Sequence, residues 1–399
     1  MTFPHGSPSS LRAVTSNRFN IAIVSNGQDP INLFSDAIYA KCSDPRDKIF
    51  ALLGLFPHVL SQKIQPRYIQ SAREVYREAV IAYVECSGSL DFLSLTGPSW
   101  IPDWSVQRRV FTTLGRHCSS NSTVEVTHVA PDILVATGIS FDTVEAVTNP
   151  LPDDDSKILE MVWDLWLKGT SRSQMYPTGD PLADACAWTL NTGRLADRWP
   201  KESSTRTTMA GARLLFQQLQ EGGDVSLASG ARLEKAVVAV GSTLFKTAKG
   251  FLGMSLQEVK VGDRVSILLG CAMPTILRTQ PEGRQLFVAC VYVHGLMDGE
   301  ALLGPIPKGW KVVTGYDRNG DYLQQFVNSK TDKGTPLDPR LGPLSADWEP
   351  VIKPDRLWPT KKVDGFKNIT TGQILHSDPR LLPDALRTRG VPVEKFALV

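Results

Sequence analysis

Cysteine is scarce in this chain of 399 residues, and its spacing excludes two common kinds of cross-linked protein. No two cysteines have the Cys-x-x-Cys spacing of a zinc site. Six cysteines are also too few for a disulfide framework at this length. The sequence therefore predicts a protein in a reducing compartment, folded around an apolar core that 42% hydrophobic residues can supply. The cysteines are Cys42, Cys86, Cys118, Cys186, Cys271 and Cys290.

Long apolar runs and an excess of one charge are missing too. No stretch approaches the roughly 18 apolar residues of a membrane span, and Met1 to Asn17 has no apolar core of signal-peptide length. The formal net charge is +2, which predicts no basic face for nucleic acid. We therefore expect a cytoplasmic protein without nucleic-acid or membrane partners, and its oligomeric state stays open.

Motifs of known catalytic classes are also absent. There is no Gly-x-Ser-x-Gly elbow, no Walker loop and no Gly-x-Gly-x-x-Gly after a strand. His117 and Cys118 are adjacent, whereas catalytic Cys–His pairs meet across a fold. The sequence therefore identifies no catalytic residue, and it predicts no cofactor and no metal site.

The apolar pattern predicts an α+β protein in which helical and β segments are segregated. Helical spacing over 72–83, with Gly88 behind it, predicts a helix, and alternation around Ala130-Pro131 predicts a hairpin. Short strands between 243 and 294 predict a small barrel. The expected parts are a flexible tail at 1–29, a helical region with a Trp-rich turn and β-hairpin at 30–150, a helical region at 151–240, a small β-barrel-like domain at 241–330, and a proline-rich tail with a terminal helix at 331–399.

A short helix is predicted at Asp44-Pro-Arg-Asp-Lys-Ile-Phe-Ala-Leu-Leu-Gly-Leu55. Asp44 suits the cap, Pro45 the first helical position and Asp47 the positive first turn. An alternative is a catalytic carboxylate–guanidinium cluster of Asp44, Arg46 and Asp47, but capping and ion pairing already explain both acids. One apolar face, expected to bury against the next helix or to form an exposed patch, contains Ile49, Leu52, Leu53 and Phe56.

Two further groups are candidates for a pocket. Trp100, Asp103 and Trp104 lie in a proline-bounded turn, where aromatic walls with one acid suit a cation or a sugar. Large aromatics more often bury as anchors, which is the competing interpretation.

The second group is His294, Asp298 and Glu300, which places three ligand types of a metal site within seven residues. A strand that ends at Gly295 leaves the directions of these side chains open, and no second histidine is near. A structured turn is the competing interpretation.

Several motifs, in order, resemble the fungal heterokaryon incompatibility (HET) domain proteins. The resemblance spans about residues 30–395 and includes a short echo, Leu337-Asp-Pro-Arg-Leu341 and Ser377-Asp-Pro-Arg-Leu381. Two copies do not predict a solenoid. The motifs are Asp44 to Leu55, Glu74-Val-Tyr76, Trp100-Ile-Pro-Asp-Trp-Ser105, Gly250-Phe-Leu-Gly253, Gly262-Asp-Arg-Val265, Pro274-Thr-Ile-Leu-Arg278, Tyr292-Val-His-Gly-Leu-Met-Asp-Gly-Glu300 and Asp378-Pro-Arg-Leu381.

The resemblance implies a role in vegetative incompatibility and programmed cell death. The Leu-Ser-Tyr-x-Trp-Gly-like and Trp-Ile-Asp-x-x-Cys-Ile-like segments of the family's signature domain do not precede Asp44. The chain therefore resembles the carboxy-terminal portion of a family member.

Three functions remain open from the sequence. The first is a non-catalytic regulatory or recognition protein that binds a protein partner. The second is an enzyme or accessory protein of a fungal specialised (secondary) metabolite pathway, with a site between the helical and β parts near Asp103 and His294. The third is a chain that has lost its activity along with the signature domain.

Overall fold

The computed structural model describes residues 30–111, 117–130, 132–171, 173–198, 208–220, 240–316, 322–354 and 361–399. Helices and antiparallel sheets occupy separate parts of it, so the α+β prediction is confirmed. The predicted flexible tail at 1–29 lies outside the described residues.

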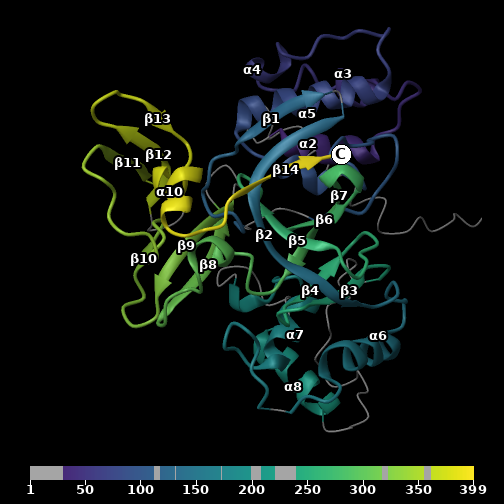
Figure 1. Cartoon of the computed structure of the whole chain (residues 1–399), viewed down its shortest axis with the longest axis vertical. Helices are drawn as coiled ribbons and strands as arrows, with labels where there is room; N and C mark the ends of the chain where they lie inside the picture. Colours follow the sequence, from purple (N-terminus) through teal and green to yellow (C-terminus); the bar gives the residue numbers. More distant parts are fainter. Residues whose placement is uncertain are drawn as a thin grey trace, which may run out of the picture.

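Helices of the amino-terminal part form a layer on one end of a barrel (Figure 1). The most regular is α5 (Ala72–Ser87), which begins with a capping box between Ser71 and Glu74 and ends at Gly88 in the left-handed region, φ 63°. The helix predicted there is confirmed. Its companions are α2 (Ile31–Tyr39), α3 (Asp47–Phe50), α4 (His58–Ser61) and the 3₁₀ turn η1 (Asp91–Leu95).

The helix predicted from Asp44 is shorter than expected. It begins at Asp47, so Pro45 is not its first residue, and the Asp44 carboxylate accepts from the Arg46 N–H outside the helix. It ends at Phe50 rather than near Leu55, because the chain continues in i→i+3 turns such as Leu55 N–H to the Leu52 carbonyl. Ile49 and Phe56 are nonetheless buried in the same core as α5. The predicted apolar face therefore packs against the next helix, with Leu52 and Leu53 half-buried at its margin.

The centre of the molecule is a closed barrel. Six strands follow one another in the order β2–β3–β4–β7–β6–β5, and β5 pairs back with β2. The predicted strands between 243 and 294 are confirmed. They are β3 (Thr243–Thr247), β4 (Leu252–Ser255), β5 (Arg264–Leu268), β6 (Thr275–Thr279) and β7 (Gln285–Val293).

Strand β2 (Ile133–Val147) joins the barrel to the rest of the fold. Its first half pairs with β1 (Val126–Ala130) on one side and β14 (Glu394–Leu398) on the other, and its second half pairs with β5 and β3. The predicted hairpin is confirmed, although its second strand continues unbroken to Val147. At Gly138 an added Cβ would lie 2.3 Å from the Ile267 carbonyl oxygen, so only glycine allows β2 and β5 to approach this closely.

The domain boundaries expected from the sequence remain predictions, but the central sheet draws strands from several of those segments. β1 and β2 come from 30–150, and β14 comes from 331–399.

The barrel strands contribute to two separate hydrophobic clusters. Phe245 lies in one of them, among valine and isoleucine side chains. Ile139 and Ile267 lie in the other, together with Leu341, Leu381 and Leu386.

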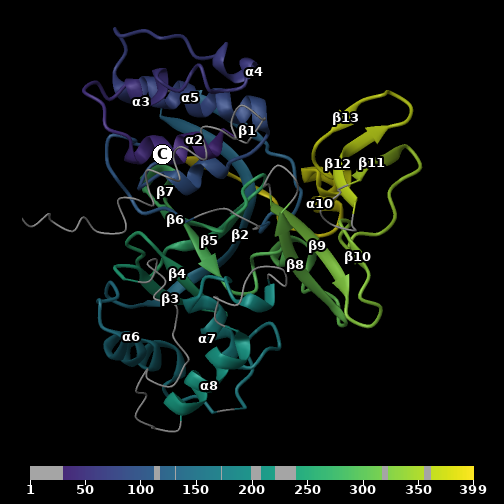
Figure 2. The same cartoon turned by 180° about the vertical axis from the view of Figure 1, so that it is seen from behind.

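A second helical group lies at the opposite end of the barrel from α2–α5 (Figures 1 and 2). The described pieces are α6 (Asp155–Val162), η2 (Trp163–Leu167), α7 (Leu182–Leu190), η3 (Ala196–Arg198) and α8 (Met209–Gln220). Asp184 of α7 and Arg213 of α8 form an ion pair of 2.5 Å that holds these two helices together.

Two small sheets project from one side of the barrel (Figures 1 and 2). One contains β8 (Trp310–Tyr316), β9 (Tyr322–Asn328) and β10 (Gly334–Thr335), and the other contains β11 (Trp348–Pro354), β12 (Lys361–Asn368) and β13 (Ile374–Leu375). The remaining elements are η4 (Pro281–Gly283), α9 (Glu300–Leu303), η5 (Pro379–Leu381) and α10 (Pro383–Thr388), the last where a terminal helix was predicted.

Candidate binding pocket

The two projecting sheets are copies of one module, which we call module A (residues 307–342) and module B (residues 345–382). In each, a tryptophan at the start of the first strand pairs with an asparagine at the end of the second, Trp310 with Asn328 and Trp348 with Asn368. Each asparagine side chain then accepts hydrogen bonds from the backbone two and three residues on. The turn that follows has the same hydrogen bonds in both modules.

Each module ends in an Asp-Pro-Arg turn of the same geometry. Arg340 donates to both carboxylate oxygens of Asp338 at 2.9 and 2.6 Å, and Arg380 donates to Asp378 at the same two distances. The second Nη of each arginine then binds a distant carbonyl, that of Gly304 for Arg340 and that of Gly342 for Arg380. The turn therefore ties each module to a neighbouring segment through a bidentate, charge-assisted pair.

A third copy of this turn is the stretch from Asp44. Arg46 donates to the Asp44 carboxylate at 2.9 and 2.6 Å and to the carbonyls of Tyr68 and Gln70. The Asp47 carboxylate accepts from the Tyr68 hydroxyl at 2.6 Å, and Pro45 contributes its carbonyl to the Tyr76 hydroxyl. Pro45, Arg46 and Asp47 thus join the α3 segment to its neighbours, and Asp44 holds the Arg46 side chain in place.

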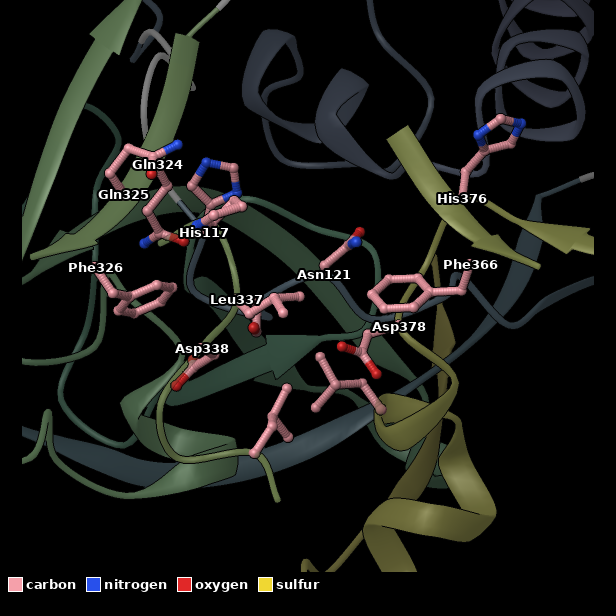
Figure 3. Close-up of a pocket in the computed structure, with 14 residues that line it drawn as sticks. His117, Asn121, Gln324, Gln325, Phe326, Leu337, Asp338, Phe366, His376 and Asp378 are labelled. Atoms are coloured by element: carbon pink, nitrogen blue, oxygen red, sulfur yellow. The ribbon is translucent and has the colours of Figure 1, made fainter. Parts of the chain in front are cut away.

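A cavity of about 230 Å³ lies between modules A and B, and equivalent residues of the two copies line it. Phe326 and Phe366 are forty positions apart in the sequence, as are the paired positions Asp338 and Asp378. Figure 3 shows Gln324, Gln325, Phe326 and His117 on one side of the space, and Phe366 and Asp378 on the other. The remaining lining residues are Ser120, Asn121, Pro336, Leu337, Leu341, His376 and Leu381.

A buried ionic network supports the module A wall. Arg198 of η3 donates to both carboxylate oxygens of Asp298, at 2.9 and 2.7 Å, and Gln324 donates to one of them at 2.9 Å. Burial alone would raise the pKa of Asp298, but the charge and hydrogen bonds of Arg198 outweigh it and lower that pKa. Arg340 also donates to the Asp298 carbonyl.

Two neighbours of Asp298 have pKa values shifted in opposite senses. Burial, followed by the Asp298 charge, raises the pKa of Glu300 to about 7. Burial lowers the pKa of His117 to about 4, against the opposing attraction of Asp298. Both groups are therefore held mainly in their neutral forms near pH 6.

The sequence grouped His294 with Asp298 and Glu300, and the structure gives His294 a separate set of contacts from the other two. His294 stacks on Trp188, with ring centroids 6.2 Å apart, and its Nε2 lies 3.5 Å from Asp180. Asp298 instead binds Arg198, and Glu300 accepts from the Asp298 backbone N–H at 2.7 Å. Throughout the described part of the chain, no three metal-binding side chains come together.

The Trp-rich turn lies in the amino-terminal core, away from the cavity. Trp100 and Trp104 are fully buried, and Trp104 stacks on Phe34 at 5.1 Å between centroids. The Trp100 Nε1 donates to the Asp132 carbonyl at 3.0 Å. Asp103 is exposed and caps the backbone N–H of Ser105. Asp103 and His294, which the enzyme hypothesis brought together, thus make separate sets of contacts.

The cavity was not predicted from the sequence, although the sequence contains part of the repeat that forms it. The repeated Asp-Pro-Arg-Leu was noted, but its forty-residue spacing also relates Asn328 to Asn368 and Phe326 to Phe366. His117 has no such signal, because only the tertiary fold brings it to the modules. Gln324 and Gln325 belong to module A, but module B has no glutamine at the equivalent positions.

Comparison with known proteins finds one domain. A family model described as the Het-6 beta-barrel domain matches residues 226–304, a domain found in fungal HET proteins. No curated protein matches the chain, and no solved structure matches it. The matched range contains β3 to β7, while β2, which closes the barrel, lies outside it.

No described helix is long and apolar enough to cross a membrane.

Proposed function

We propose that this protein is a regulatory or recognition factor of the heterokaryon incompatibility type, which acts in the cytoplasm through contacts with a protein partner. The observation that carries the proposal is the Het-6 β-barrel match at 226–304, next to which modules A and B build a lined cavity. In this proposal the two modules and the cavity are the contact region, and partner binding leads to growth arrest or cell death.

The roles of the charged side chains support binding over catalysis. Two of the acids that the sequence offered as reactive groups are engaged in ion pairs: Asp298 pairs with Arg198, and Asp44 pairs with Arg46. The acids of the cavity wall, Asp338 and Asp378, are likewise paired with arginines. The enzyme of a specialised metabolite pathway remains the second hypothesis, and no contact in the described structure favours it.

Expression in a filamentous fungal host tests the proposal. Leu337 is half-buried in the cavity wall, so Leu337→Arg places a long charged side chain in the cavity. Ile369→Arg makes the same change of charge on an exposed turn of module B, outside the cavity lining. We expect the wild-type chain and Ile369→Arg to slow colony growth and admit a membrane-impermeant dye, and Leu337→Arg to lose both effects. Equal effects of all three chains, or none from the wild type, would contradict the proposal.

A further inference from the structure

We infer that one end of module A is a basic docking surface for an acidic segment of a partner protein. This lysine end consists of residues 308–311 and 327–333. The inference rests on the proposed function, since it names the chemistry of the partner that the modules bind. It adds a surface outside the cavity, because none of the lysines of this end lines that space. The lysines are Lys308, Lys311, Lys330 and Lys333.

Backbone hydrogen bonds bring two of these lysines together from different segments. The Ser329 N–H donates to the Gly309 carbonyl at 2.7 Å. Lys330 and Lys308 are each adjacent in sequence to one of these residues, so their backbones lie near each other. Both lysines are exposed, on a module that projects from the side of the barrel (Figures 1 and 2).

The other two lysines belong to the same end of the sheet. The Asn328 N–H donates to the Lys333 carbonyl at 3.0 Å, and Asn328 also pairs across the strands with Trp310. Lys311 follows Trp310 directly, and both Lys311 and Lys333 are exposed. One asparagine position therefore connects the segments that carry all four ammonium groups.

The lysine end has a local excess of positive charge that the net charge of the chain does not show. Four lysines and Asp332 give it a formal charge of +3, whereas the whole chain has +2. Within the described residues, no carboxylate forms an ion pair with a lysine of this end. Like charges that lie together without counter-charges produce a field that attracts anions. Other exposed lysines do lie within 4.0 Å of a carboxylate, namely Lys63, Lys157, Lys168, Lys260 and Lys367.

Module B offers an internal comparison, because its equivalent end has the same backbone hydrogen bonds and a different charge. That end consists of residues 346–349 and 367–373 and has a formal charge of −1. Its Lys367 pairs with Glu349 at 3.6 Å. The turn therefore folds without the lysines of module A, which supports a role for them in binding. The residues at the four lysine positions are Ala346, Glu349, Thr370 and Gln373.

The chemistry of the lysine end favours carboxylates of a protein over nucleic acid or lipid. Arginine, which binds phosphates with two parallel hydrogen bonds, is absent from it. No large apolar side chain is exposed in the described part of module A, so none is available to insert among lipids. Lysines are flexible point charges, and a run of glutamates or aspartates can meet four of them without a fixed geometry.

Fluorescence anisotropy on the purified full chain, with labelled decaglutamate as the probe, tests this surface. Lys330→Glu/Lys333→Glu reverses two charges of the lysine end. Lys41→Glu/Lys157→Glu is the matched control, because it makes the same change in net charge at exposed positions outside module A. We expect the wild type and the control to bind decaglutamate alike, and the Lys330/Lys333 variant to bind it at least tenfold more weakly. Absence of decaglutamate binding, or equal affinity of the two variants, overturns the inference.

The melting temperature distinguishes binding from a structural role of the lysines. In the turn, Lys330 and Lys333 donate hydrogen bonds through their backbone N–H groups, which the substitutions retain. The substitutions also remove repulsion between like charges, so we expect a melting temperature at or above that of the wild type. A lower melting temperature would assign the lysines to the stability of the fold and overturn the inference.

Two competing probes test the choice of an acidic protein. They are a DNA duplex of about 20 base pairs and vesicles that contain phosphatidylserine, each measured under the same salt conditions as decaglutamate. We expect both to bind more weakly than decaglutamate. Binding of either one at least tenfold more tightly than decaglutamate overturns the inference.

The outcomes separate this inference from the proposed function. Decaglutamate binding that depends on Lys330 and Lys333, with fungal growth indifferent to Leu337→Arg, supports the basic docking surface and rejects the proposed function. Growth that depends on Leu337, without decaglutamate binding, supports the proposed function and rejects the docking surface.

Discussion

At the scale of single residues, Asp298 connects parts of the chain that are far apart in sequence. Its carboxylate binds Arg198 from the second helical group and Gln324 from module A, and its carbonyl binds Arg340. A buried acid with this many partners is stabilising only while all of them remain in place. Its two titrating neighbours, His117 and Glu300, have pKa values that burial shifts in opposite senses.

These neighbours give opposite contributions to the pH dependence of stability. Glu300 has a raised pKa of about 7 against 4.5, so the folded state binds the extra proton and stability falls as pH rises through this window. His117 has a lowered pKa of about 4 against 6.5, so the unfolded state binds the extra proton and stability rises with pH. In the wild type the two trends largely cancel.

Single variants are expected to expose each trend in urea denaturation between pH 4.5 and 6.5. Relative to the wild type, Glu300→Gln gains stability with rising pH and His117→Gln loses it, each by about 2 kcal/mol across the window. The glutamine oxygen of Glu300→Gln can still accept the Asp298 N–H, so the fold is retained. Difference curves of the same sign would contradict this assignment.

At the scale of elements, the Asp-Pro-Arg turn recurs three times with one geometry but with different burial. The side chains of Arg340 and Asp338 are 4% and 5% exposed, whereas those of Arg46 and Asp44 are 24% and 28% exposed. The Arg380 pair lies between them, at 15% and 5%. We therefore expect the burial of each ion pair to decide how much its turn contributes to the free energy of unfolding.

Asparagine substitution at the three turns should rank them by burial. Asp338→Asn leaves the charge of Arg340 buried without a carboxylate, and we expect a loss of about 3 kcal/mol or more. Asp378→Asn should cost less and Asp44→Asn least, as read from the midpoints of urea denaturation. Asp384→Asn, whose carboxylate is 96% exposed, is the control and should not shift the midpoint. A larger effect at Asp44 than at Asp338 would contradict the ranking.

Elements were predictable where local pattern decides them. The capping box of α5 and the glycine- and proline-bounded strands β3 to β7 lie within short windows of sequence. β14 was not predicted, because its five residues become a strand only by pairing with β2. The spacing of His294, Asp298 and Glu300 could not show the directions of their side chains, since tertiary contacts set the path of the chain after Gly295. The cavity is formed by three segments that are distant in sequence, and no local pattern shows that they meet.

At the scale of the whole molecule, the barrel depends on strands from outside the range that the Het-6 family model matches. β2 closes it between β3 and β5, and β14 pairs with β2 and reaches β7 at Leu398–Gln285. Phe396 of β14 is 2% exposed and belongs to the core that also contains the amino-terminal helices. We therefore expect the last strand to stabilise the amino-terminal helices.

Truncation of this side chain tests that dependence. Phe396→Ala removes a buried ring, and we expect a loss of about 3 to 5 kcal/mol. Hydrogen exchange should show reduced protection both at Leu134–Gly138 of β2 and in α5. Lys395→Ala on the exposed face of the same strand is the control. Loss of protection in β14 alone would show that the strand is an independent appendage.

The length and pairing of β2 also have a consequence for synthesis on the ribosome. The strand is complete at Val147, but its partner β3 begins at Thr243, β5 at Arg264 and β14 at Glu394. During translation β1 can pair with the first residues of β2, but the rest of its edges must remain unpaired until these distant segments emerge, which is a condition that favours slow folding and aggregation. We therefore expect chains interrupted before Arg264 to be captured by chaperones or degraded, and the β2 edge to be the segment that they bind.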